Sequence, residues 1–426
     1  MAAPATRTAS AEPDRAGKPA FPVVGIGASA GGYEAFVQLL QAVPANTGMA
    51  FVFVMHLEPE HQSMLAKLLA NVTPMAVEEA RNGTQVQPNH VYVIPPKADM
   101  RIQGGVLQIV LRRMTDGRYL PVDNFLLSLA EDRPSSGIGV ILSGTGSDGT
   151  LGLKAIKAEG GITFAQDEET AKHFGMPGSA IAAECVDFVL APDRIGEELD
   201  RLSRHPYVGL PQLPKLPELA PVGETDFRKI LFLLRASHGV DFTYYKPGTV
   251  RRRIARRMAL QRVESMKKYL DHLQSDQGEV DALFHDILIH VTSFFREPDT
   301  FRTLQTRIFP KIMANKTAGE AIRIWIPGCS SGEEVYSLAI ALLEFLGDRV
   351  SATPIQAFGT DISELAIEKA RAGTYTESNL REVSPVRLRR YFTRTEGGYR
   401  VNKTLREMCI FARQDLTKDP RSRASI

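Results

Sequence analysis

The sequence predicts an α/β protein with a doubly wound parallel sheet, then a helical region, then a truncated Rossmann-like sheet. First, apolar runs of strand length alternate with segments of helical periodicity from residue 21 to about residue 200, which is typical of parallel sheets covered on both faces. Second, residues 225–291 contain few glycines and carry dense charge at helical spacing. Third, two strand-turn-helix units begin at residues 321 and 354.

The individual elements can be placed in chain order. A helix is expected over residues 33–41, because apolar residues recur there at helical spacing. Repeated prolines in residues 205–221 favour an extended spacer. Strands are expected at the continuous apolar runs, which are residues 22–26, 50–55, 90–94, 138–142, 186–190, 321–327 and 354–359.

These elements divide the chain of 426 residues into five parts. The expected parts are a disordered leader (residues 1–20), a first α/β domain (21–205), a proline-rich linker (206–222), a helical domain (223–300) and a partial second α/β domain (301–426).

Composition limits the classes of function. The formal net charge of +2 gives no global field that would favour nucleic acid. No apolar run reaches the roughly 18 residues that a membrane-spanning helix needs, so we expect no membrane insertion. Cys185, Cys329 and Cys409 lie far apart and fit neither a disulfide framework nor a zinc site, so we expect a cytoplasmic protein without a metal.

Ser29 lies in a glycine-rich turn between the first expected strand and the first expected helix. The residues Gly27-Ala-Ser29-Ala-Gly31 match the G-x-S-x-G elbow of serine hydrolases. The overlapping run Gly25-Ile-Gly27-Ala-Ser-Ala30 matches the G-x-G-x-x-A dinucleotide fingerprint. A turn without chemistry is the third interpretation, and this segment alone does not separate the three.

A candidate base and a candidate acid follow two other strands. His56 comes directly after the strand expected at residues 50–55, and Asp148 lies in the glycine-rich loop after residues 138–142. Because sites in open α/β sheets form at the carboxyl ends of the strands, we expect Ser29, His56 and Asp148 to meet there. A serine nucleophile needs such a base and acid. His56 also stands where dinucleotide binding would want an acid, which disfavours a dehydrogenase.

The segments GIGASAGG, MHLEPEH, HVYVIPP, SGTGSDG and AQDEETAKHFGMP together resemble the catalytic domain of the chemotaxis receptor methylesterases, the CheB type. The resemblance covers residues 22 to about 200 and implies Ser29 as nucleophile, His56 as base and Asp148 as the orienting acid, with no cofactor. The implied substrates are methylated glutamates of receptor helices, with deamidation of glutamines at the same sites. The receiver domain of the stand-alone enzyme does not fit within the first 20 residues, so we expect activity without a phosphodonor.

The second half resembles the chemotaxis receptor methyltransferases, the CheR type, through HVTSFFREPDTF, RIWIPGCSSGEEVYSLA and FGTDISELAIEKAR. The resemblance implies a helical domain followed by a domain that binds S-adenosylmethionine. By position it implies that Thr292, Arg296, Glu333 and Asp361 contact this cofactor. An aspartate after the second strand can accept from ribose hydroxyls, and Arg296 can pair with the methionyl carboxylate. Glu333 would meet the amino group.

A cluster of arginines lies on one expected helix, residues 250–260. Like charges at i,i+4 spacing repel each other, so the cluster does not serve helix stability. A solvated basic face is one interpretation and an acidic partner is the other. In the methyltransferase family this helix faces the receptor, so we expect it to bind acidic segments of methyl-accepting chemotaxis receptors. The arginines are Arg251, Arg252, Arg253, Arg256 and Arg257.

The family pattern breaks off after residue 416, before an expected strand with a Cys-Arg-Asn motif. A sheet that stops after about three strands leaves unpaired edges, so we expect a defective methyltransferase half with residues 320–426 loosely ordered. Two classes of function stay open. One is a working methylesterase fused to an incomplete methyltransferase, and the other is a non-catalytic, receptor-binding regulatory module.

Overall fold

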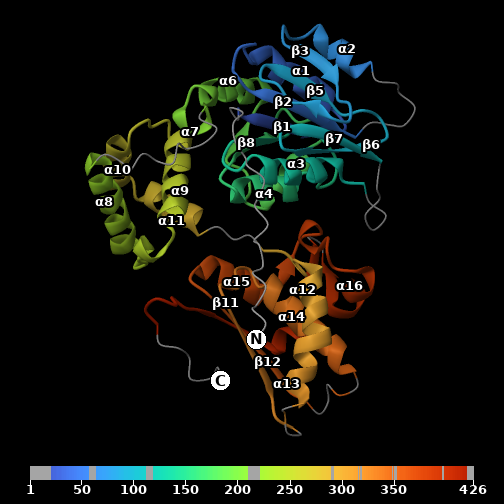
Figure 1. The fold of residues 1–426 in the computed structure, drawn as a ribbon, viewed down its shortest axis with the longest axis vertical. Helices are drawn as coiled ribbons and strands as arrows, with labels where there is room; N and C mark the ends of the chain where they lie inside the picture. The colour runs from blue at the N-terminus through green and yellow to red at the C-terminus, as the bar shows by residue number, and fades with distance from the viewer. Residues whose placement is uncertain are drawn as a thin grey trace, which may run out of the picture.

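The fold is described from a computed structural model of the chain. The expected leader, residues 1–20, and most of the expected linker, residues 210–220, lie outside the described residues. Figure 1 shows a first sheet domain, a group of helices beside it and a second sheet domain below them. The described residues are 21–56, 64–111, 119–209, 221–288, 292–314, 316, 319–347, 349, 353–395 and 398–419.

The first domain is built on a sheet of seven strands in the order β10-β9-β8-β1-β2-β5-β3. All pairs in this sheet are parallel and the chain winds outward from β1 in both directions, which confirms the doubly wound prediction. Every residue of β1 and β8 is buried, which explains their continuous apolar sequences. The strands are β1 (Val23–Ala28), β2 (Ala50–Met55), β3 (Ala76–Glu79), β5 (His90–Val93), β8 (Gly137–Ile141), β9 (Ile162–Gln166) and β10 (Phe188–Leu190).

Helices cover both faces of this sheet. Helices α1 (Gly32–Ala42) and α6 (Pro192–Ser203) pack on one face, and α3 (Pro121–Asp132) and α4 (Thr150–Ala158) pack on the other. A Cβ added at Gly27 of β1 would lie 2.1 Å from Val122 Cγ1, so the glycine lets α3 approach the strand closely. This approach brings the first turn of α3 to the carboxyl edge of the sheet.

Smaller elements complete the first domain. An antiparallel sheet in the order β4-β7-β6, which the sequence did not predict, lies beside the main sheet. Its strands are β4 (Thr84–Gln85), β6 (Ala98–Gln103) and β7 (Val106–Leu111), and the further helices are α2 (Leu65–Ala70), α5 (Gly175–Ala182) and α7 (Pro206–Gly209).

Both ends of the expected linker are helical, in contrast to the extended spacer that the prolines favoured. Helix α7 occupies residues 206–209, and the buried Tyr207 donates a hydrogen bond to the Gly160 carbonyl oxygen at 2.7 Å. Helix α7 therefore belongs to the first domain. The helical domain begins at Pro221, and its core includes Leu234, Tyr269 and Leu283. Its elements are α8 (Pro221–His238), η1 (Phe242–Tyr244), α9 (Pro247–Leu260), α10 (Met266–Ser275) and α11 (Gln277–Ile287).

The third domain contains a parallel sheet in the order β11-β12-β16 and an antiparallel sheet in the order β13-β15-β14. None of the described helices, here or earlier in the chain, combines the length and apolar character needed to span a bilayer. The strands are β11 (Ile322–Pro327), β12 (Ile355–Asp361), β13 (Thr374–Tyr375), β14 (Phe392–Thr395), β15 (Gly398–Val401) and β16 (Cys409–Arg413). The helices are α12 (Pro298–Thr303), η2 (Leu304–Ile308), α13 (Phe309–Ala314), α14 (Glu333–Leu346), α15 (Glu364–Ala372), η4 (Ser378–Leu380), α16 (Pro385–Tyr391) and α17 (Lys403–Glu407).

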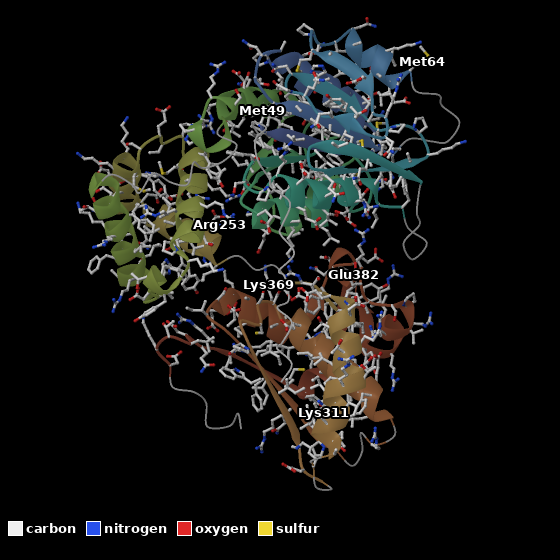
Figure 2. The ribbon with its side chains drawn as sticks, in the orientation of Figure 1. Met49, Met64, Arg253, Lys311, Lys369 and Glu382 are labelled. Carbon is white, nitrogen blue, oxygen red and sulfur yellow. The ribbon has the colours of Figure 1, made fainter. Side chains whose placement is uncertain are left out.

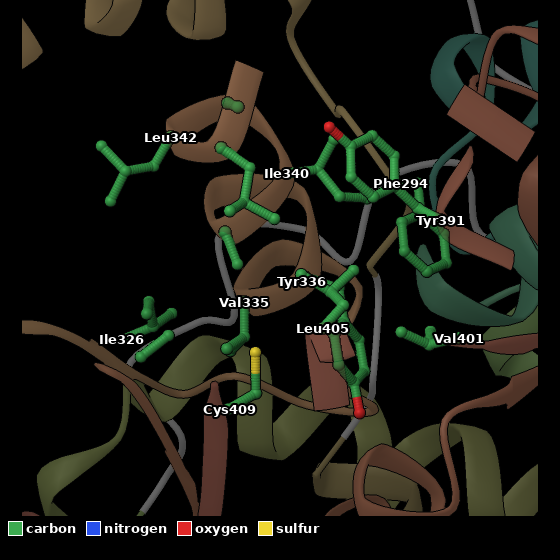
Figure 3. Close-up of a cluster of buried hydrophobic side chains, with 14 of the residues drawn as sticks. Phe294, Ile326, Val335, Tyr336, Ile340, Leu342, Tyr391, Val401, Leu405 and Cys409 are labelled. Carbon is green, nitrogen blue, oxygen red and sulfur yellow. The ribbon is translucent and has the colours of Figure 1, made fainter. Parts of the chain in front are cut away.

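The third domain has a packed core, which differs from the loose order expected for residues 320–426. Tyr336 of α14 is fully buried and donates a hydrogen bond to the Ala370 carbonyl oxygen at 2.8 Å. Figure 3 shows Tyr336 close to Leu405 and Cys409, which come from α17 and β16. On the edge strand β16, however, Ile410 is 47% exposed. The core therefore forms around α14 although part of the sheet remains uncovered.

Candidate functional site

Ser29 lies in the turn that joins β1 to α1 and is half-buried. Its backbone N–H donates to the Ser143 carbonyl oxygen at 3.0 Å, and its own carbonyl accepts from Gly32 N at 3.0 Å. Gly31 has a φ of 76°, and a Cβ there would lie 2.8 Å from Ser143 Oγ. The turn therefore needs glycine, and the serine is held at the amino end of α1.

His56 stands at the same level on the neighbouring strand. Ala28 pairs with Met55 in the parallel register of β1 and β2, so Ser29 and His56 are the next residues of the two strands. The backbone N–H of His56 extends this pairing by donating to the Ala28 carbonyl oxygen at 3.3 Å. Adjacent strands lie about 4.8 Å apart, so the register brings the two residues together, as the sequence predicted.

Asp148 is the direct partner of His56. His56 Nε2 lies 2.8 Å from Asp148 Oδ2, and the carboxylate is only 3% exposed. The first turn of α3 holds this carboxylate, because Val122 N donates to Oδ2 at 3.0 Å and Asp123 N donates to Oδ1 at 2.9 Å. These two bonds hold the carboxylate at the amino end of α3 and orient it towards the imidazole.

The nitrogen of His56 that can serve as the base follows from the contact with Asp148. His56 Nε2 faces Asp148, which leaves Nδ1 as the ring nitrogen that can accept the serine proton. Ser29 Oγ forms no hydrogen bond with the described residues, and such contacts often tighten only when substrate binds. Ser143 Oγ, which donates to the Ala30 carbonyl oxygen at 2.8 Å, fixes the turn that presents Ser29. The amino end of α1 thus lies beside the nucleophile, where oxyanion charge would develop.

Asp123 is a feature of this site that the sequence analysis missed. It is 1% exposed, and its Oδ1 accepts from Gly152 N in the first turn of α4 at 2.9 Å. Burial, and then the charge of Asp148, raise the pKa of Asp123 to about 7. The sequence carried one signal for it, an acid two residues after a proline at a helix start, but that pattern is common.

Glu333 and Asp361 flank the turn after β11 in the third domain. Asp361 ends β12, and its two oxygens accept from Ser330 N at 2.8 Å and Ser363 N at 2.9 Å. Glu333 begins α14, is 1% exposed and accepts from Ser331 Oγ at 2.8 Å. Burial raises the pKa of Glu333 above its ordinary range. The structure thus brings these two predicted residues to the same edge of the sheet.

Thr292 and Arg296 flank a segment that packs against α14. Phe295 N donates to Ser337 Oγ at 3.0 Å, and Ser337 lies one turn after Glu333. Arg296 itself is exposed. The helical domain also faces this edge, because burial and then the charges of Asp415 and Asp361 raise the pKa of its Tyr245. The structure therefore places the segment of Thr292 and Arg296 near Glu333.

The prediction that the arginines of α9 form an exposed binding surface is wrong for Arg253 and Arg256. These side chains are 3% and 0% exposed, and they join α9 to the first domain. Arg256 forms ion pairs with Asp187, which precedes β10, and with Asp286 of α11, whose Oδ1 lies 2.6 Å from Nη1. Arg253 Nη1 donates to the Lys157 carbonyl oxygen at 2.9 Å, and Figure 2 shows Arg253 between the two domains.

Charge complementarity explains this burial. Burial alone would lower the pKa of Arg256, but the carboxylates of Asp187 and Asp286 raise it well above its ordinary value. Arg257 is also paired, since its Nε donates to Glu279 Oε1 at 2.9 Å. The helical periodicity identified the basic face, but it could not show that acidic groups of this same chain cover it. Arg251 and Arg252 are the half-exposed members of the cluster.

Comparison with known proteins shows three family matches in chain order. Residues 24–199 match the CheB methylesterase family, residues 225–288 match the all-alpha domain of CheR methyltransferases, and residues 290–425 match the SAM binding domain of CheR methyltransferases.

Individual relatives share parts of this arrangement. An uncharacterized 104.1 kDa protein of Rhodobacter capsulatus is 36% identical over 84% of this chain and 39% of its own length. A protein-glutamate methylesterase/protein-glutamine glutaminase of Carboxydothermus hydrogenoformans is 40% identical over 43% of this chain and 56% of its own length. The chain therefore spans about two-fifths to just over half of these relatives. The crystal structure of the Thermotoga maritima CheB methylesterase catalytic domain is similar to 43% of this chain and is covered over 99% of its length, with 34% identity and a TM-score of 0.41.

Proposed function

Because this chain joins a CheB methylesterase domain to the all-alpha and SAM binding domains of the CheR methyltransferase family, we propose that its first domain hydrolyses methyl esters of glutamate side chains in chemotaxis receptors. Ser29 is the nucleophile, His56 the base and Asp148 the orienting acid. The observation that carries this proposal is the 2.8 Å contact between His56 and Asp148, made at the strand level where Ser29 leaves β1.

The reaction follows from the positions of these groups. Ser29 Oγ attacks the ester carbonyl while His56 Nδ1 accepts the serine proton, and the imidazolium is stabilised by Asp148. The negative charge on the carbonyl oxygen develops beside the amino end of α1. His56 returns the proton to the leaving methoxide, which departs as methanol. Water then attacks the acyl-serine while His56 accepts its proton. His56 returns this proton to Ser29 Oγ as the glutamate carboxyl is released.

The same site can act on glutamine side chains. The primary amide of glutamine has the same carbonyl carbon for Ser29 to attack, and His56 would protonate the leaving ammonia. Both reactions end in a glutamate carboxylate. The names of the related methylesterase/glutaminases pair these two activities, which supports assigning both to this site.

The third domain carries groups that fit S-adenosylmethionine. The buried Ser330 Oγ has no hydrogen-bond partner among the described residues, and it lies in the turn between Glu333 and Asp361. Two buried carboxylates with a free hydroxyl suit a ligand that carries ribose hydroxyls and an ammonium group. When bound, the cofactor supplies a methyl group on a positively charged sulfur. We assign Asp361 to the ribose, Glu333 to the amino group and the segment of Thr292 and Arg296 to the methionyl end.

A direct assay separates turnover from binding alone. The full-length protein is incubated with methylated receptor fragments, and methanol is measured beside ammonia from glutamine-containing fragments. We expect both products from the native chain, a loss of at least about a thousandfold in His56→Ala, and a large loss in Asp148→Asn, which favours the wrong histidine tautomer. Binding of fragments by the native chain with no product would support the alternative of a non-catalytic receptor-binding module.

A further inference from the structure

The third domain reaches the helix turn that holds the Asp148 carboxylate. Arg381, which follows η4, donates from Nη2 to Asn124 Oδ1 at 2.8 Å, although the two residues are 257 positions apart. Asn124 is the residue directly after Val122 and Asp123, whose N–H groups bind Asp148. Figure 2 labels Lys369 and Glu382 along the side of the third domain that faces the first.

The surroundings of Arg381 link this contact to the triad. Helix η4 packs on α4, which begins directly after the loop of Asp148. The buried carboxyl of Asp123 joins the first turns of α3 and α4, because it accepts from Gly152 N. The charge of Arg381 opposes the rise in the pKa of Asp123 that burial and Asp148 cause. Arg381 therefore acts on the same turn through a hydrogen bond and through its charge.

On the basis of the proposed esterase function, we propose that Arg381 of the SAM-binding domain is a positioning residue for the esterase triad. Its bond to Asn124 fixes the first turn of α3, and that turn fixes Asp148 against His56. Docking of the third domain thereby couples the methyltransferase half to the activity of the esterase half. Displacement of a catalytic group by about 1 Å can lower a rate by up to about a hundredfold, so a modest loosening of this turn is measurable.

A second contact between the same two domains provides the control. Lys369 pairs with Glu184 at 2.5 Å, and the two side chains are 55% and 73% exposed. Among the described residues, the hydrogen bond of the Lys369 side chain goes to Glu184, which lies after α5 and outside both α3 and the loop of Asp148. Removing this pair weakens docking in general, whereas removing Arg381 also releases the turn that binds Asp148.

The test compares Arg381→Gln with Lys369→Gln in the full-length protein. In Arg381→Gln we expect kcat for methanol release to fall roughly three- to tenfold at unchanged KM. We also expect hydrogen exchange in the segment of Val122 and Asp123 to be at least about threefold faster. Arg381→Lys, which can still reach Asn124 with a charge, restores most of kcat. Asn124→Ala gives the same loss, and adding Arg381→Gln to it gives no further loss.

The outcomes separate this inference from the proposed function. Equal effects of Arg381→Gln and Lys369→Gln, or unchanged exchange in α3 after Arg381→Gln, would overturn the positioning role while methanol release by the native chain still supported the esterase. Faster exchange in α3 of Arg381→Gln than in the native chain, together with no methanol release by the native chain, would support the structural link and reject the proposed function.

Discussion

Two carboxyl groups share the first turn of α3, and their environments set them apart. Asp148 receives two backbone N–H groups and the imidazole of His56, whereas Asp123 receives Gly152 N and is buried beside the charge of Asp148. The pKa of Asp123 is raised from 3.8 to about 7, first by burial and then by Asp148. Asp123 is therefore a largely neutral structural group near pH 6, while Asp148 is the carboxyl that orients His56.

This difference predicts a pH-dependent effect of Asp123→Asn. Between about pH 4 and pH 7 folded Asp123 keeps a proton that the unfolded chain has released, so its contribution to stability falls as pH rises through that window. Asparagine does not titrate. The free energy of unfolding of Asp123→Asn minus that of the native chain should be about 2 kcal/mol larger at pH 8 than at pH 5. The variant is therefore the more stable of the two, in relative terms, at the higher pH.

Urea unfolding at the two pH values, at one ionic strength, measures this difference. An exposed carboxyl makes a matched control, and Glu131→Gln on the last turn of α3 should show the same effect at both pH values. An equal effect of Asp123→Asn at pH 5 and pH 8 would show that Asp123 ionises normally.

A second prediction for single residues concerns the proposed cofactor site at Glu333. Glu333 is buried, while its neighbour Glu334 is exposed on the same helix start. We expect Glu333→Gln to weaken S-adenosylmethionine binding by about 10- to 100-fold, because a charge-assisted hydrogen bond to the ammonium group is lost. Titration calorimetry with the cofactor measures this change, and Glu334→Gln should bind like the native chain. If Glu333→Gln bound the cofactor with native affinity, Glu333 would not be a residue that binds the amino group.

At the scale of elements, α9 is the helix whose environment differs most from the expectation. A basic helix face on an isolated domain would be solvated, but here Asp187 and Asp286 lie on either side of Arg256. Replacing one partner of a buried ion pair leaves the other charges uncompensated, which costs about 3–5 kcal/mol. The helix therefore ties the helical domain to the first domain.

Arg256→Ala and Arg252→Ala test this role of α9. We expect Arg256→Ala to lower the free energy of unfolding by about 3–5 kcal/mol, and Arg252→Ala, at a half-exposed position of the same helix, to lower it by less than about 1 kcal/mol. Urea unfolding followed by circular dichroism gives both values. Similar losses in the two variants would mean that Arg256 is not buried between the acids.

The sequence predicted which strand ends meet at the candidate site, but it did not predict the contacts between the domains. Ser29, His56 and Asp148 could be predicted because each follows a buried parallel strand, and such strands end at one edge of the sheet. The partners of Arg256 could not be predicted in this way. A helical period shows which side chains share a face, but Asp187 lies 69 residues away and meets that face only through the tertiary packing.

At the scale of the whole molecule, the domains are joined unequally. Arg253 and Arg256 are buried between the first two domains, whereas the hydrogen bonds of Arg381 and Lys369, which join the third domain to the first, come from half-exposed or exposed side chains. Trp325, the single tryptophan of the chain, lies in β11 of the third domain and donates to Thr360 Oγ at 3.0 Å. Its fluorescence therefore reports unfolding of the third domain.

This arrangement predicts two unfolding transitions. We expect the Trp325 fluorescence to change at lower urea than the far-ultraviolet circular dichroism of the remaining helices, because the third domain has fewer buried contacts with its neighbours. Coincident transitions by both probes would mean that the three domains unfold as one cooperative unit.

Methanol release from methylated receptor fragments by two serine variants tests whether Ser29 is the nucleophile of a methylesterase. Ser147 lies in the loop of Asp148, is half-buried and provides a matched control hydroxyl. We predict that Ser29→Ala loses at least about a thousandfold in rate while Ser147→Ala stays within a few-fold of the native chain. Methanol release by Ser29→Ala at a rate close to that of the native chain would contradict the claim.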